Sequence, residues 1–178
     1  ILSGPVRVMQ PRPGFGPRTL YVIGGDEYAG AGGEVFLPSM EIYDLQAASW
    51  KAGVPMPKAC SYTSAEVLDG KIYVLGGVLD PAGRQSVNVV QVFDLLAGTW
   101  AEAAPLMTPR ARHASAVVGG KLYVIGGLTH GVGELASVEA FDPQTGKWTE
   151  VAPMPTGRSE LKAAVLDGKI YAIGGFDE

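Results

Sequence analysis

The sequence is poor in the residues on which several large classes of protein depend. It contains one cysteine, Cys60, and two histidines among 178 residues. A single cysteine cannot form an intramolecular disulfide, which excludes a small secreted domain held together by disulfides. No apolar run approaches the roughly 18–20 residues of a membrane-spanning helix, and residues 1–10 lack the pattern of a signal peptide. These absences leave the compartment open and favour the cytoplasm.

Charge is also scarce, because charged residues make up 18% of the chain and the net charge is only −4. No long block of either sign occurs, so we expect neither nucleic acid nor a membrane as a partner. The chain is rich instead in glycine, with 25 residues, and proline, with 13, alongside 47% hydrophobic residues. Tight turns that join short apolar strands give rise to such a composition. The length is that of one domain.

A repeat of about 50 residues runs through the chain. Its first marker is a pair of glycines that follows an apolar phrase containing tyrosine, such as Leu-Tyr-Val-Ile. Its second marker is an aromatic residue followed at once by Asp, with a tryptophan seven residues after the aromatic and 26 residues before the next glycine pair. The glycine pairs are Gly24-Gly25, Gly76-Gly77, Gly126-Gly127 and Gly174-Gly175. The aromatic residues and their tryptophans are Tyr43 with Trp50, Phe93 with Trp100, and Phe141 with Trp148.

Two-residue turns within each repeat predict β-hairpins, because Asp-Gly and Gly-Gly suit the positive φ angles of a tight hairpin turn. The turns are Asp69-Gly70, Gly119-Gly120 and Asp167-Gly168. We expect strand A of each hairpin at residues 61–68, 113–118 and 161–166, and strand B at residues 72–75, 122–125 and 170–173. Strand C should end at the aromatic-Asp pair and strand D should begin near the tryptophan. Four antiparallel strands per repeat are typical of a β-propeller blade.

These markers resemble the Kelch family, and the resemblance extends from about Leu20 to the end of the sequence. It implies an all-β, Kelch-type propeller with about three and a half four-stranded blades. The expected units are 20–70, 71–120, 121–168 and a partial unit, 169–178, after a degenerate segment, 1–19, in which prolines interrupt strand A. Closed propellers have roughly 4–8 blades, so we expect the missing blades in a longer chain or in a second copy that forms a homodimer.

The strand order places the D–A and B–C connections on one rim of the propeller, and we expect a ligand there because variable loops on a rigid scaffold carry function. The candidate ligand-binding residues are Ser61, Arg110, Arg112, His113, Arg158 and Ser159. Similarity to the Kelch-like substrate adaptors of cullin ubiquitin ligases implies that Arg112 and Ser159 recognise an acidic peptide, since arginine binds carboxylates bidentately. Glu160 would repel such a peptide. Arg110 and Arg158 also suit a structural role at the junction between blades.

The sequence therefore predicts a non-enzymatic scaffold for a protein or peptide, with no cofactor and no metal. One alternative is a truncated or engineered repeat array that assembles into a closed propeller. A second is a sugar-acid mutarotase of the Kelch type, which would use Arg112, Arg158 and Glu160. A copper radical oxidase of the Kelch type would need a cysteine next to a tyrosine in space, two histidine ligands and a further tyrosine; for these the chain offers only the minimal set Cys60, Tyr62, His113 and His130. Catalysis by Cys60 as a nucleophile has little support, because the sequence places no His-Asp pair beside it.

Overall fold

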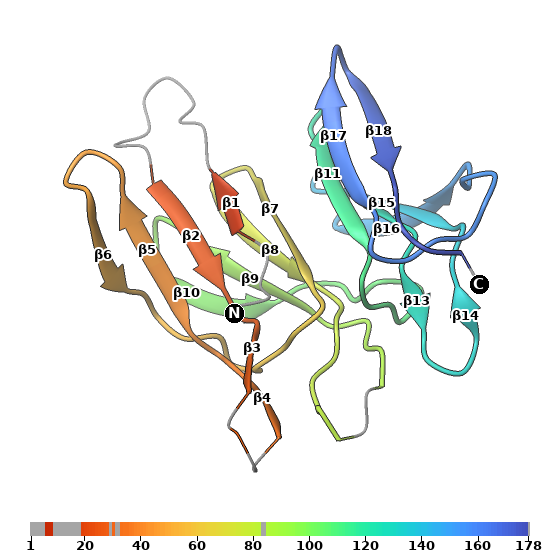
Figure 1. Ribbon diagram of the computed structural model, residues 1–178. Coiled ribbons are helices and arrows are strands. Elements are labelled where there is room, and N and C mark those ends of the chain that lie inside the picture. Colours follow the sequence, from red (N-terminus) through yellow and green to blue (C-terminus); the bar gives the residue numbers. More distant parts are fainter. Residues whose placement is uncertain (1–5, 9–18, 29, 31–32, 83–84, 178) are drawn as a thin grey trace.

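The computed structural model describes residues 6–8, 19–28, 30, 33–82 and 85–177, and these form β-strands joined by turns and loops. Three four-stranded antiparallel sheets follow one another along the chain, and a two-stranded hairpin comes after them (Figure 1). We call them sheet 1, sheet 2, sheet 3 and the terminal hairpin. In the part of the chain so described, no helix has the length and hydrophobicity needed to cross a membrane.

Each sheet is a meander whose spatial order equals the order of its strands in the chain. Sheet 1 contains β1 (Val6–Val8), β2 (Thr19–Ile23), β5 (Met40–Asp44) and β6 (Ser49–Ala52). Sheet 2 contains β7 (Ser64–Leu68), β8 (Lys71–Leu75), β9 (Val90–Asp94) and β10 (Thr99–Glu102). Sheet 3 contains β11 (Ala114–Val118), β12 (Lys121–Ile125), β15 (Val138–Asp142) and β16 (Lys147–Val151). The terminal hairpin contains β17 (Lys162–Leu166) and β18 (Lys169–Ile173).

The strands predicted from the repeat are present, and those of type C end at the aromatic-Asp pair as expected. The hairpin turns have the predicted geometry, with φ of 50° at Asp69 and 74° at Gly70. Strand A begins later than predicted, at Ser64 rather than residue 61 in sheet 2. The reason is Tyr62, whose φ of 55° is left-handed and interrupts the extended backbone.

Sheet 1 departs from the expectation for its first strand. Its strand A is β1, which pairs with β2 from Val6↔Val22 to Val8↔Leu20. The sheet is thus four-stranded although prolines occupy the sequence between these strands, and the proline-containing segment 9–18 lies outside the described residues. The loops between strands B and C hold two short hairpins that the sequence did not predict: β3 (Asp26–Tyr28) with β4 (Glu34–Phe36), and β13 (Leu128–Thr129) with β14 (Gly133–Glu134).

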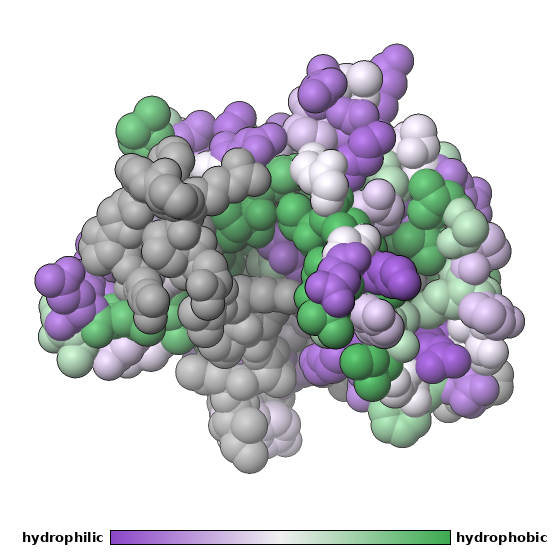
Figure 2. Space-filling view, turned by 90° about the horizontal axis from the view of Figure 1, so that it is seen from above, coloured by the Kyte–Doolittle hydropathy of each residue, from purple (hydrophilic) through white to green (hydrophobic). Residues whose placement is uncertain are grey.

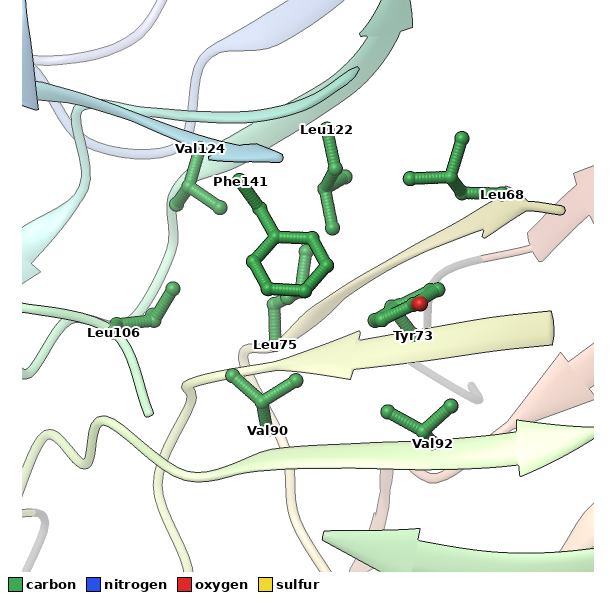
Figure 3. Packing of buried hydrophobic residues seen from close by; sticks show 9 residues of the cluster. All are labelled: Leu68, Tyr73, Leu75, Val90, Val92, Leu106, Leu122, Val124 and Phe141. Carbon is green, nitrogen blue, oxygen red and sulfur yellow. The ribbon is translucent and has the colours of Figure 1, made fainter. Parts of the chain in front are cut away.

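The sheets are arranged around their first strands, since β11 contacts both β7 and β17. At each junction, one face of a sheet packs against the sheet that follows it in the chain. We call the face toward the preceding sheet the leading face and the face toward the following sheet the trailing face. Between sheets 2 and 3, the trailing residues Tyr73 and Leu75 meet the leading residues Leu122 and Phe141 (Figure 3). The rings of Tyr73 and Phe141 lie 5.7 Å apart between centroids. Burial of these apolar faces is the main force that holds successive sheets together.

The repeated tryptophans fasten neighbouring sheets. The indole N–H of Trp100 donates to the carbonyl of Val54, just after sheet 1, and that of Trp148 donates to Ala104, just after sheet 2, both at 2.9 Å. Each tryptophan also packs on the aromatic residue of its own strand C, as Trp100 does on Phe93 at 5.1 Å. The tryptophans therefore pack between adjacent blades, with an apolar body against one sheet and a polar N–H bonded to the sheet before it.

Candidate functional site on the loop rim

The D–A loops (53–63, 103–113 and 152–161) and the B–C loops (24–39, 76–89 and 126–137) meet on one rim, as the strand order predicted. Isolated β-bridges join them at Ser61↔Val78, Ala111↔Leu128 and Ser159↔Phe176. We call this the loop rim; the B–C loops that form it lie along the lower edge of Figure 1, and the tight turns of β5–β6 and β17–β18 lie at the opposite edge. The scaffold therefore gathers loops from all its sheets on one surface.

The glycine pairs hold these loops together through their backbone. Gly77 donates its N–H to the carbonyl of Arg110 at 2.8 Å, and Gly25 and Gly127 make the equivalent bonds to Cys60 and Arg158. The φ angles of Gly76 and Gly77 are 54° and 94°. A Cβ atom at Gly76 would lie 2.5 Å from the Arg110 carbonyl oxygen. The pairs are required for close backbone approach and for left-handed geometry, so their role is structural.

Three equivalent residues on the D–A loops carry side chains in the left-handed region, where glycine is the usual residue. They are Tyr62, Arg112 and Glu160, with φ of 55°, 55° and 57°. Backbone hydrogen bonds link them in sequence, because Arg112 N–H donates to the Tyr62 carbonyl at 2.8 Å and Glu160 N–H donates to the Arg112 carbonyl at 2.7 Å. We call these three residues the rim row.

The side chains of the rim row interact in the same order as their backbones. The guanidinium carbon of Arg112 lies 4.7 Å from the centre of the Tyr62 ring, a cation–π contact. Its Nη1 lies 2.7 Å from Oε1 of Glu160, and the two side chains are 31% and 44% exposed. Tyr62 in turn donates its hydroxyl to Glu34 on β4 at 2.8 Å, and burial together with this carboxylate raises the pKa of the tyrosine. The row thus holds an arginine side chain in a defined position at the surface.

The two candidate serines are buried behind this surface. Ser61 donates its hydroxyl to Asp26 at 2.5 Å, and Ser159 donates to Glu134 at 3.4 Å. Each therefore ties a D–A loop to an acidic residue on the B–C loop of the preceding sheet. Since both serines are almost fully buried, their hydroxyls serve the scaffold.

Arg110 lies in the interior and is 0% exposed. It forms a salt bridge of 2.6 Å with Glu139 on β15 and donates further hydrogen bonds to the backbone of Gly126 and to Ser137. Burial lowers the pKa of Arg110, and the adjacent Glu139 opposes that shift and keeps the guanidinium charged. A soluble ligand cannot reach this side chain, so Arg110 belongs to the junction between sheets 2 and 3.

His113 and Arg158 also belong to the scaffold. His113 is 5% exposed, and burial and the charge of Arg110 lower its pKa to about 3, so it is neutral near pH 7. Neither ring nitrogen has a hydrogen-bond partner among the described residues. Arg158 is half-buried and donates from Nη1 to the carbonyl of Gly174 at 3.2 Å. Of the six candidate residues, Arg112 alone combines substantial exposure with a place in the rim row.

Neither Tyr62 nor Glu34 was among the residues predicted to bind a ligand, although Tyr62 contacts Arg112 and Glu34 contacts Tyr62. A signal for Tyr62 existed, because Tyr62, Arg112 and Glu160 each lie twelve residues after a repeated tryptophan. Glu34 had no such signal, since it lies in a loop whose length differs from repeat to repeat. Its contact with Tyr62 arises only when the B–C loop folds back over the D–A loop.

The fold and the rim define the chain as a β-propeller of Kelch repeats. A profile described as the KLHDC2/KLHL20/DRC7 Kelch-repeats domain matches residues 14–175. The chain therefore belongs to this Kelch-repeat family. Among solved structures it is similar to one titled "Structure of YjhT", with a TM-score of 0.74, 22% sequence identity and coverage of 88% of this chain. The chain spans about half of that protein, 56% of its length. A search of curated proteins found no match.

Proposed function

We propose that the chain is a non-enzymatic scaffold that binds a protein or peptide on the loop rim. Kelch-repeat domains generally act as protein-interaction scaffolds, and the match to this family supports that class of function. The observation that carries the location is the rim row, in which Tyr62 and Glu160 hold Arg112 between them at the surface. Side chains kept in a strained backbone conformation are often found at functional positions.

The chemistry of Arg112 suits a ligand carboxylate. A guanidinium has five N–H donors, and Glu160 engages only Nη1, so the remaining donors are available to an acidic side chain or a chain terminus. The ligand must compete with Glu160 and must also lie near Glu34. We therefore propose a peptide with a single carboxylate at Arg112 rather than a long acidic run.

Exposed apolar side chains on the same rim would supply the rest of the contact. They are Tyr28, Val35, Val132 and Phe176, which are 80%, 41%, 76% and 63% exposed. Interfaces between proteins commonly combine an apolar and aromatic centre with charged groups that fix orientation. The loop rim offers both kinds of group on loops that the glycine pairs hold in place.

Cys60 and His113 are both buried. Burial raises the pKa of Cys60 to about 12, so its reactive thiolate form is negligible near neutral pH. His113 is enclosed and neutral. These two environments support a binding role over catalysis by Cys60 or His113.

The binding site can be tested with peptides selected from a randomised phage-displayed library on the purified chain. A selected peptide containing Glu or Asp and its Gln or Asn analogue are then titrated by calorimetry. We expect Arg112→Ala to weaken the acidic peptide at least tenfold and to abolish its advantage over the amide analogue. Lys121→Ala is the matched control, because Lys121 carries the same charge near the turn between β11 and β12, away from the loop rim. Equal affinity of wild type and Arg112→Ala would remove Arg112 from the site.

The sequence also predicts a homodimer that completes the propeller. A second copy would bind at the two ends of the row of sheets rather than at the loop rim.

A further inference from the structure

A serine and a histidine from neighbouring B–C loops meet on the loop rim. The hydroxyl oxygen of Ser86 lies 2.9 Å from Nδ1 of His130 and 3.1 Å from the carbonyl oxygen of Leu128. It also accepts the backbone N–H of His130 at 3.2 Å. Ser86 lies in the loop between β8 and β9, whereas His130 directly follows β13. A hydroxyl beside an imidazole is the pairing of a nucleophile with its base, so the placement of the protons decides what the pair can do.

The pair connects two of the D–A loops that carry the rim row. Ser86 is joined by β-bridges, through one intervening residue, to Ser61, which precedes the first residue of the row. Leu128 is bridged to Ala111, which precedes Arg112. The serine and the histidine therefore lie within the surface that we propose for the peptide.

The three contacts of the Ser86 hydroxyl determine the direction of each hydrogen bond. The Leu128 carbonyl can only accept, and the backbone N–H of His130 can only donate. The hydroxyl has one proton, so it donates that proton to Leu128 and accepts from the backbone N–H. Nδ1 must then carry a hydrogen and donate it to the second lone pair of the serine oxygen. This is the one assignment in which all three contacts are hydrogen bonds.

The assignment makes the other ring nitrogen of His130 an acceptor. A neutral imidazole with hydrogen on Nδ1 has none on Nε2, which then bears a lone pair. Ser86 is not activated as a nucleophile in this arrangement, because the ring donates to its oxygen instead of taking its proton. The His130 side chain is half-buried, and its Nε2 has no hydrogen-bond partner among the described residues and is not one of their buried atoms.

We infer that Nε2 of His130 accepts a hydrogen bond from an N–H group of the peptide that Arg112 holds by a carboxylate. The inference rests on the proposed function and deepens it, because it adds a donor to the chemistry required of the ligand. Nearby charge favours a donor over a second carboxylate, since Glu134 lies opposite Leu128 in the same loop hairpin. The ligand class is thus a peptide segment that presents both a carboxylate and an N–H donor.

The protonated nitrogen can be identified by NMR of the full chain, labelled with ¹⁵N at histidine, in mildly alkaline buffer. The chain has two histidines, and His113→Thr leaves the signals of His130 alone. We expect hydrogen on Nδ1 of His130 and none on Nε2. Ser86→Ala removes the acceptor and should shift the ring toward the opposite tautomer. A wild-type His130 with hydrogen on Nε2 only would overturn the inference.

Two variants separate contact with the ligand from contact with Ser86. His130→Asn keeps an N–H group at the position of Nδ1 and has no atom at that of Nε2, whereas His130→Ala removes both. In calorimetric titrations with the selected acidic peptide, both should bind about fivefold more weakly, which is the effect of one hydrogen bond. Wild-type affinity in His130→Asn would show that the histidine acts through Ser86 alone and would overturn the inference.

Gln144→Ala is the control for these titrations and should keep wild-type affinity. Gln144 is exposed on the β15–β16 turn, at the edge of the scaffold opposite the loop rim. Figure 2 views the molecule from that edge and shows hydrophilic side chains along its upper border. Weakened binding in Arg112→Ala beside wild-type affinity in His130→Asn would overturn the role of His130 and leave the proposed function in place. Wild-type affinity in Arg112→Ala would overturn the proposed site, and the role of His130 with it.

Discussion

The junction between sheets 1 and 2 and the junction between sheets 2 and 3 have the same backbone and different chemistry. At the first, the Gln91 amide forms two 2.9 Å hydrogen bonds with the backbone of Lys58, and Cys60 lies nearby at 3.9 Å from the amide nitrogen. At the second, Glu139 occupies the position of Gln91, and Arg110 occupies that of Cys60. Glu139 accepts hydrogen bonds from two backbone N–H groups and forms the salt bridge with Arg110.

The difference shows that the repeat fixes where a buried polar group must be placed, and leaves its charge free to vary. An amide can both donate and accept, so Gln91 satisfies a backbone N–H and a carbonyl without a counter-ion. A carboxylate can only accept, and its buried charge requires a cation. Arginine at residue 110 is therefore a consequence of glutamate at residue 139. The comparison yields four predictions, from the largest expected effect to the smallest.

Arg110→Cys should destabilise the chain by about 4 kcal/mol, because it leaves the carboxylate of Glu139 buried without a cation. The double variant Arg110→Cys with Glu139→Gln installs the chemistry of the first junction in the second and should recover more than half of that loss. Urea unfolding followed by circular dichroism measures both. If the double variant were as unstable as the single one, the two junctions would not be interchangeable.

Trp100→Ala should cost about 3 kcal/mol, since it removes a large side chain that packs on Phe93 and bonds to the preceding sheet. Trp50→Ala is the matched control from sheet 1 and should cost about 1 kcal/mol, because that indole is 54% exposed. The same unfolding experiment compares them. Similar losses at both positions would show that the tryptophan acts within its own sheet rather than across a junction.

His113 should make the second junction sensitive to pH. Its pKa is about 3 in the folded chain against 6.5 in the unfolded chain, so between these values the unfolded chain binds more protons. Stability should be fully present well above pH 6.5 and should fall by about 3 kcal/mol by pH 4.5. His113→Thr, which installs the equivalent Thr63, should flatten this part of the pH profile. An unchanged slope in thermal unfolding between pH 7 and 4.5 would assign the sensitivity to another group.

The turns between strands C and D extend the comparison to sheet 1. Ala48 has a φ of 50° at the position where sheets 2 and 3 have Gly98 and Gly146, with φ of 68° and 66°. Ala48→Gly should therefore stabilise the chain by about 1 kcal/mol, and Gly98→Ala should destabilise it by a similar amount. Because a Cβ at Gly98 would meet no atom within 4 Å, the effect is one of backbone conformation alone. Thermal shifts of the same sign for both variants would contradict this.

Much of the fold could be predicted because it depends on short-range patterns that recur. The glycine pair needs left-handed geometry, the Asp-Gly turn closes a hairpin, and the aromatic-Asp pair ends a strand; the Asp94 carboxylate accepts the N–H of Leu96 and Ala97 there. These backbone hydrogen bonds lower the pKa of Asp94, so the turn keeps its charge near neutral pH. Each such pattern acts within a few residues, so it can be recognised in the sequence.

The site could be predicted only in part. The repeat placed Arg112 on the loop rim, and it placed Arg110 and His113 there too, although the side chains of those two residues are buried in the scaffold. Arg110 and Arg112 carry the same charge two positions apart on one loop, but only Arg112 adopts a left-handed backbone, which turns its side chain outward. Backbone conformation of that kind has no signature in residue type.

The sequence by itself determined the repeat, the order of strands within each sheet, the loop rim and the positions at which sheets meet. These follow from the spacing of the apolar and glycine residues, which recurs from one repeat to the next. The tertiary structure decided which polar residues are structural and which face solvent, because that depends on contacts between residues about thirty positions apart, such as Arg110 with Glu139 and Tyr62 with Glu34. It also showed that the face formed by Leu166, Tyr171 and Ile173, built like those between sheets, is open on the terminal hairpin, since burial is a property of the neighbour and not of the residue.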